Sequence, residues 1–157
     1  MLFSQDEFDG SMTISTPVLN GDDLSVDDET AGLDIDIHVA KNVKTSITLL
    51  SSYSGKAWMF HDLIEVKSGA GYFRKKVPFS SLHNDVSGGT VYEVAGVDLG
   101  ESEFASLCKI MGGRKPLLRL TGSAGQAYEV SGRMTKANVM QIQDACVSYA
   151  WIWNLKK

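Results

Sequence analysis

Three polar residues alternate along one short segment of the chain. Asp34, Asp36 and His38 are each separated by one apolar residue, so in a strand their side chains project from the same face, about 7 Å apart. Such a row could hold a divalent cation if another strand supplied more ligands, and His61 is the fourth candidate. An antiparallel strand with one solvated face shows the same alternation without a metal. We therefore predict no metal and no cofactor, and retain a small enzyme or metal-assisted site on this wet face as the second hypothesis.

Nucleophilic catalysis needs a serine or cysteine beside a histidine base. The chain has three histidines, His38, His61 and His83, and none of them lies in a recognisable catalytic motif. Cys108 and Cys146 fall on apolar faces of predicted helices, where thiols stay protonated and inert. We assign no catalytic residue and favour a protein that is not an enzyme.

The two cysteines and the ends of the chain indicate a compartment. Cys108 and Cys146 are 38 residues apart with no CxxC pair, which predicts two reduced thiols rather than a disulfide framework. The first residues lack the basic and apolar regions of a signal peptide, and no apolar run approaches the length of a membrane span. We expect a soluble, cytoplasmic protein without membrane contact.

The net charge of -4 conceals two regions of opposite sign. Residues 1–40 hold ten Asp or Glu and no Lys or Arg, whereas residues 41–157 hold nine acidic and fifteen basic residues. A hydrophobic fraction of 43% is typical of a globular protein, but the acidic segment has little apolar surface to bury. We predict a mobile acidic arm over 1–32 and a single domain over 33–157. The alternative for the arm is an edge strand followed by a long loop.

Two-residue periodicity predicts strands through the first half of the domain. Alternation predicts strands over 33–39 and 44–53. A hairpin over 57–67 and 72–79 places Glu65 opposite Arg74 and Val66 opposite Phe73, so that opposite charges pair and apolar side chains pair across the two strands. The segment over 80–89 reads as a loop, and 90–97 as a strand.

The second half combines two helices with a further hairpin. A helix capped by Ser102 should end at Gly112-Gly113 in a left-handed residue. A hairpin over 117–121 and 127–133 with a three-residue loop would set Leu120 opposite Tyr128. Thr135 should cap a final helix over 136–154. This order predicts an α+β fold, a mainly antiparallel sheet with two helices packed on one side.

The final helix has more apolar circumference than one sheet can cover. At 100° per residue, one stripe is assigned to the sheet. A second cluster, Met140, Val147 and Trp151, lies on another side, and a patch of this composition marks partner surfaces. The alternative is that the acidic arm or the segment over 80–89 covers it. The stripe assigned to the sheet comprises Val139, Ile142, Cys146, Tyr149, Ala150 and Trp153.

The favoured function is a protein-protein interaction or self-assembly module that forms a homo-oligomer, with Met140, Val147 and Trp151 as the partner-binding residues. The acidic arm is a second candidate surface. A third hypothesis is single-stranded nucleic-acid binding, because aromatic and basic side chains alternate in one segment. A pI near 5.3 and the expected pairing of its charges disfavour that reading. Its residues would be Tyr72, Phe73, Arg74 and Lys76.

Overall fold

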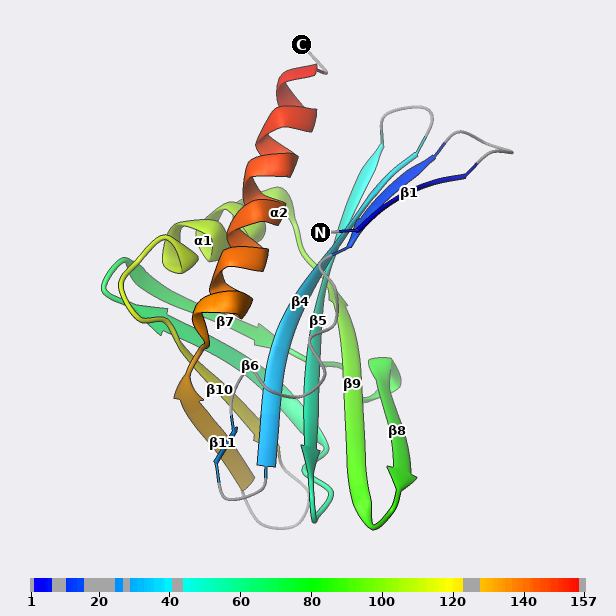
Figure 1. The fold of residues 1–157 in the computed structure, drawn as a ribbon, viewed down its shortest axis with the longest axis vertical. Helices are drawn as coiled ribbons and strands as arrows, with labels where there is room; N and C mark the ends of the chain where they lie inside the picture. Colours follow the sequence, from blue (N-terminus) through cyan, green and yellow to red (C-terminus); the bar gives the residue numbers. More distant parts are fainter. Residues whose placement is uncertain are drawn as a thin grey trace.

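The structure of this chain is a computed structural model that describes residues 2–6, 11–15, 25–26, 29–40, 44–122 and 128–155. These residues form two antiparallel sheets and two α-helices (Figure 1). The predicted α+β class with mainly antiparallel pairing is therefore confirmed, although the strands divide between two sheets where one was expected.

Sheet A holds seven strands in the order β1-β2-β4-β5-β9-β8, with β3 also paired to β4. Its central strands β4 and β5 are long because two-residue alternation persists through both of them. Leu33 lies opposite Ser51, and both side chains are buried. The strand bounds are β1 Leu2–Gln5, β2 Met12–Ser15, β3 Ser25–Val26, β4 Glu29–Val39, β5 Thr45–Gly55, β8 Leu82–Ser87 and β9 Thr90–Asp98.

Sheet B holds four strands in the order β11-β10-β6-β7. The predicted register of its first hairpin is confirmed, since Glu65 lies opposite Arg74 and Val66 opposite Phe73. The chain passes from sheet A to sheet B between β5 and β6. The strand bounds are β6 His61–Ser68, β7 Gly71–Lys76, β10 Leu117–Gly122 and β11 Tyr128–Arg133.

The second hairpin of sheet B differs from the prediction by two residues. Leu120 pairs with Val130 rather than with Tyr128. The loop that was expected to set the register lies outside the described residues. Because a shift of two keeps each side chain on the same face, the inward and outward alternation is preserved.

The two helices pack beside the sheets. Helix α1 (Glu101–Met111) lies against β6 and β7, and α2 (Lys136–Leu155) lies against β4 and α1. Helix α1 begins at Glu101 with Gly100 as its N-cap, two residues before the predicted cap Ser102. It ends at Gly112 in right-handed rather than left-handed geometry, and the positive φ of this turn belongs to Lys115. The predicted cap of α2 is confirmed, because the Thr135 hydroxyl accepts from the Asn138 backbone N–H at 3.2 Å.

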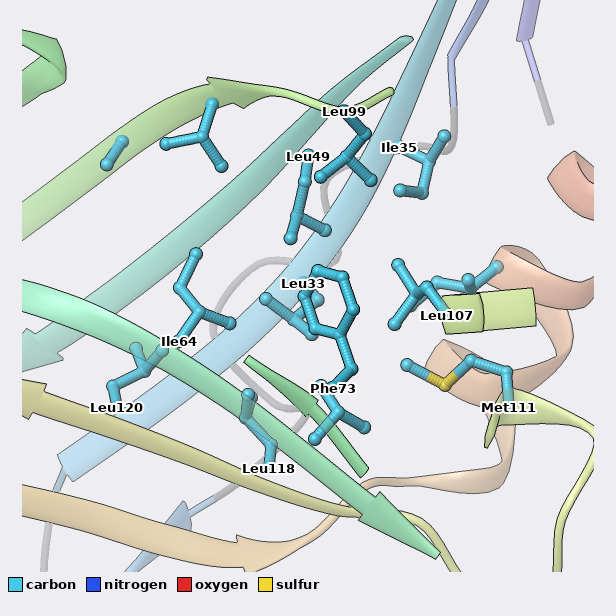
Figure 2. Close-up of a cluster of buried hydrophobic side chains, with 14 of the residues drawn as sticks. Leu33, Ile35, Leu49, Ile64, Phe73, Leu99, Leu107, Met111, Leu118 and Leu120 are labelled. Carbon is cyan, nitrogen blue, oxygen red and sulfur yellow. The ribbon is translucent and has the colours of Figure 1, made fainter. Parts of the chain in front are cut away.

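The core lies between the two sheets and is completed by the helices (Figure 2). Leu33 from sheet A, Ile64 from sheet B and Leu107 from α1 are all fully buried. The other core residues labelled in Figure 2 are Ile35, Leu49, Phe73, Leu99, Met111, Leu118 and Leu120.

Helix α2 is rotated from the predicted orientation. Asn138, Ile142, Ala145 and Ile152 of α2 are buried, and the Asn138 amide donates to the Leu33 carbonyl of β4 at 2.6 Å. Two members of the predicted sheet-facing stripe instead meet α1, since Cys146 lies beside Cys108 and Tyr149 meets Phe104 edge to face. Ala150 is exposed, and the side chain of Trp153 lies outside the described part. The amphipathic pattern did not distinguish the helix neighbour from the sheet neighbour, since both are apolar.

Parts of the predicted arm and of the predicted 80–89 loop are strands. Among the described residues of the first 32, all but Asp6 and Ser11 lie in β1, β2, β3 and the start of β4, and the long loop of the edge-strand alternative lies outside the described residues. The mobility of the arm stays a prediction. The 80–89 prediction was wrong, because β8 pairs with β9 around a turn at Gly88-Gly89, where both glycines have positive φ. Its polar residues are those of an exposed edge strand.

The cysteine prediction is also wrong. Cys108 of α1 and Cys146 of α2 form a disulfide with their Cα atoms 5.8 Å apart. Sequence spacing could not show this, because the two helices become neighbours only through the packing of the strands between them. Within the described residues, neither helix is long and apolar enough to cross a membrane.

Candidate functional site

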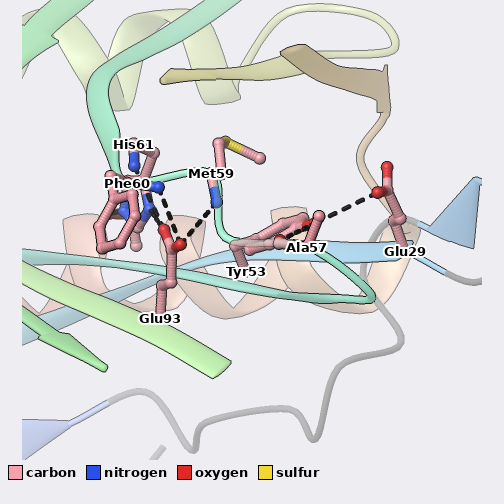
Figure 3. Close-up of polar contacts among 8 residues, drawn as sticks. Glu29, Tyr53, Ala57, Met59, Phe60, His61 and Glu93 are labelled. Atoms are coloured by element: carbon pink, nitrogen blue, oxygen red, sulfur yellow. Dashed lines mark hydrogen bonds and ion pairs between the residues drawn. The ribbon is translucent and has the colours of Figure 1, made fainter. Parts of the chain in front are cut away.

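A buried polar chain links the two sheets where the polypeptide passes from β5 to β6 (Figure 3). Ser51 Oγ lies 2.9 Å from His61 Nε2, and His61 Nδ1 lies 3.0 Å from Glu93 Oε2. Because a carboxylate only accepts, Nδ1 carries the proton, and in the neutral ring Nε2 accepts from the Ser51 hydroxyl. All three residues are at most 1% exposed. They join β5, β6 and β9 in one hydrogen-bonded unit.

The Glu93 carboxylate is also bound by backbone groups. Its Oε1 accepts from the N–H groups of Met59 at 2.7 Å and Phe60 at 2.8 Å, and its Oε2 accepts from the N–H of His61. Phe60 has a φ of 49°, a left-handed conformation that turns successive N–H groups towards one anion. The Trp58 ring stacks on Phe60 at 5.6 Å between centroids. The carboxylate therefore shapes the crossover between the sheets.

The electrostatics of this unit favour an ionised carboxylate. Burial acts to raise the pKa of Glu93, but the hydrogen bonds from His61 and from three backbone N–H groups outweigh it and lower that pKa below its ordinary value. Nearby, burial and the Glu29 carboxylate raise the pKa of Tyr53, whose hydroxyl donates to Glu29 at 3.2 Å. A fixed charge with saturated acceptors is typical of a structural site.

The order serine, histidine, carboxylate is also that of a catalytic triad. A nucleophile must reach its substrate, and here the Ser51 side chain is fully buried. The grooves found on the described surface are lined by other residues. The arrangement therefore joins the two sheets, and its serine is enclosed by them. Sequence reasoning missed it because the three residues lie on three strands without a shared motif.

The wet-face candidates do not come together. Asp34, Asp36 and His38 do share one face of β4, as predicted, whereas His61 lies in the interior between the sheets. His38 is exposed, and its Nδ1 lies 3.1 Å from the Thr13 hydroxyl on the neighbouring strand β2. Asp34 is buried. Within the described part of the chain, no group of three or more His, Cys, Asp or Glu side chains is placed to hold a metal ion. The geometry does not support the hypothesis of a shared site.

The outer face of sheet B carries a groove of about 530 Å³. At its centre Glu65 accepts from the Tyr72 hydroxyl and from Arg119 Nε, the latter at 2.5 Å. Arg119 also lies 3.6 Å from Glu129. The Arg119 hydrogen bond holds the pKa of Glu65 below its usual range, against its burial. The exposed side chains of Tyr72 and Leu117 form apolar parts of the groove.

The residues of the nucleic-acid hypothesis divide between two faces. Tyr72, Arg74 and Lys76 are exposed on the outer face of β7, whereas Phe73 is buried in the core and cannot stack on a base. Charge pairing also differs from the expectation. Glu65 binds Arg119 instead of Arg74, and Lys75 reaches Glu103 of α1 at 2.7 Å. Arg74 is therefore not the hydrogen-bond partner of Glu65, although its charge still lowers the pKa of that carboxyl, and Asp62 lines one groove with Arg74 and Lys76.

The second apolar cluster of α2 is exposed to solvent. Met140 is 50% exposed, Val147 69% and Trp151 64%. Within the described residues, no other segment covers these three side chains. We call Met140, Val147 and Trp151 the α2 strip. Beside them, Gln143 donates to the Met111 carbonyl at 2.7 Å and faces α1.

In comparisons with family models, with curated proteins and with solved structures, no match to this chain was found. Its function must therefore be argued from its own geometry.

Proposed function

We propose that this protein is a self-assembly module whose copies associate through the α2 strip. The observation that carries the proposal is the exposure of Met140, Val147 and Trp151 on the solvent-facing side of α2, which also carries Lys136, Asp144 and Asn154. Methionine and tryptophan at the centre of an interface supply much of its binding energy. A second copy offers the same strip, so a symmetric pair of helices covers both at once.

The attachment of α2 supports this role. The disulfide to α1, the Asn138 bond to β4 and the Gln143 bond to Met111 hold the helix in place. A helix that is already ordered pays little conformational entropy when it binds. The strip is thus presented by a rigid support, as an interface anchor requires.

Sedimentation velocity on matched variants tests the proposal. Trp151→Ala should weaken self-association by about 2 kcal/mol or more and leave the unfolding midpoint unchanged, since this side chain contributes to no core. Val147→Ala should also weaken it, whereas the same substitution at Val86 should not. Val86 is 54% exposed on β8, at a distance from α2 in the fold. A wild-type protein that stays monomeric at micromolar concentration refutes self-assembly.

The compartment bears on the same proposal. The cytoplasmic location expected from the sequence stays a prediction, and the disulfide argues against it because such bridges persist mainly in oxidising environments.

The four residues of the enzyme hypothesis do not come together in one site. The nucleic-acid hypothesis retains Tyr72, Arg74 and Lys76 but not Phe73.

A further inference from the structure

We infer that the outer face of sheet B is a second interaction surface, which binds the acidic N-terminal region of another copy of this chain. This inference does not rest on the α2 strip, because the surface belongs to different strands and acts through charge.

The cations of this face are arranged in rows across the four strands. One row runs Arg133, Leu117, Lys67 and Tyr72, each residue directly opposite the next in the register. All four side chains are exposed, so cationic and apolar groups alternate along this row, and Leu117, Lys67 and Tyr72 line the groove. Within the described residues, no ion pair is recorded for Lys67 or Arg133.

The remaining rows leave the face positively charged. Its cations are Lys67, Arg74, Lys76, Arg119 and Arg133, against the carboxylates Glu65 and Glu129. Both carboxylates face Arg119, which balances part of their charge. The face therefore favours a ligand that brings carboxylates together with apolar side chains.

The first 40 residues of the chain have this composition. Residues 1–28, which precede β4, hold seven carboxylates and no Lys or Arg, interspersed with aliphatic and aromatic residues, and the other three carboxylates lie in β4 itself. A dense phosphate polymer fits less well, because the chain is acidic overall and Tyr72 is the one aromatic side chain on the described outer face.

Part of the N-terminal region lies beside sheet B of its own chain, because β3 contacts β11. The outer face nevertheless stays exposed within one chain, which leaves it open to a second copy. The described part of the N-terminal region lies in β1 to β4 of sheet A, and the inner face of sheet B is the one that meets sheet A in the core. In Figure 1 the β1–β2 pair projects at the upper right, away from sheet B at the lower left. The cations of the outer face accordingly remain exposed within one chain.

A charge-swap experiment on the intact protein tests the inference. The face variant carries Lys67→Glu and Arg133→Glu, and the arm variant carries Glu7→Lys and Asp9→Lys in the connection between β1 and β2. Both carry Trp151→Ala, which removes association through the α2 strip, and Trp151→Ala alone is the parent. Sedimentation is measured at low and at high ionic strength, with circular dichroism to confirm folding.

The parent should associate at low ionic strength and dissociate as salt screens the charges. Each charge variant alone should weaken this association, and an equimolar mixture of the two should regain it, because the face variant supplies an intact acidic region and the arm variant supplies an intact basic face. Lys109→Glu, an exposed control on α1, should behave as the parent. If either variant is unfolded, Arg74→Glu with Lys76→Glu replaces the face variant, and Asp22→Lys with Asp23→Lys replaces the arm variant.

Three results would overturn the inference. They are a parent that does not associate at low ionic strength, a charge variant that associates like the parent, and a mixture that fails to associate. Binding of single-stranded DNA that the face variant abolishes, with self-association unchanged, would assign the surface to nucleic acid instead. Failure of the α2 proposal appears separately, as a wild-type association that Trp151→Ala does not change at high ionic strength.

Discussion

Reduction of the Cys108–Cys146 disulfide should lower the stability of the protein without abolishing the fold. The bridge closes a segment of 38 residues. In the chain-entropy model, a loop of that length restricts the unfolded ensemble by about 4 kcal/mol at room temperature. The helices keep other contacts after reduction, namely the packing of Phe104 on Tyr149 and the bond from Gln143 to Met111. The protein should therefore stay folded but unfold at lower denaturant concentration.

Urea unfolding with and without a dithiol reductant measures this effect. With a slope of about 2 kcal/mol per molar urea, the midpoint should fall by about 2 M. The double variant Cys108→Ser with Cys146→Ser should unfold near the reduced wild type and should not respond to reductant. Thiol titration of the unreduced, denatured wild type should detect no free cysteine. An unchanged midpoint on reduction, or two titratable thiols before it, would refute the reasoning.

Three further predictions concern the crossover between the sheets. Gly122→Ala should destabilise strongly, since a Cβ there would lie 2.0 Å from the Met59 carbonyl oxygen, whereas Gly69→Ala, with open space around it, should be nearly neutral; thermal melting compares them. Glu93→Gln should cost about 3 kcal/mol in urea unfolding, because buried N–H donors lose their anion. Folding lowers the pKa of Glu93, so the ionised carboxylate stabilises the fold above pH 4.5, the ordinary pKa of a glutamate. This stabilisation is lost as the pH falls through the folded-state pKa of Glu93. The free energy of unfolding should therefore fall less steeply at acid pH in Glu93→Gln than in the wild type, and an unchanged slope contradicts this. Ser51→Ala should cost about 1 kcal/mol in urea unfolding, because the buried His61 Nε2 loses its hydrogen-bond partner, and an unchanged midpoint would contradict this.

Local patterns determined most of the elements. Alternation located β4, β5, β6, β7 and β9 to within a few residues, and cross-strand matching of Glu65 with Arg74 set the register of the first hairpin correctly. The Thr135 cap located the start of α2, and helical periodicity separated the exposed Met140, Val147 and Trp151 from the buried sides. These features depend on neighbours within one hairpin or one helix, which the order of residues specifies directly.

Tertiary structure decided the rest. Whether the strands form one sheet or two, and which side of α2 meets β4, depends on contacts between distant segments of similar apolarity. The same is true of the disulfide and of the Ser51–His61–Glu93 chain, whose members become neighbours only when β5, β6 and β9 meet. The groove on sheet B likewise arises from four strands at once. Residue type and spacing do not predict such long-range contacts, because these contacts result from the packing of the whole core.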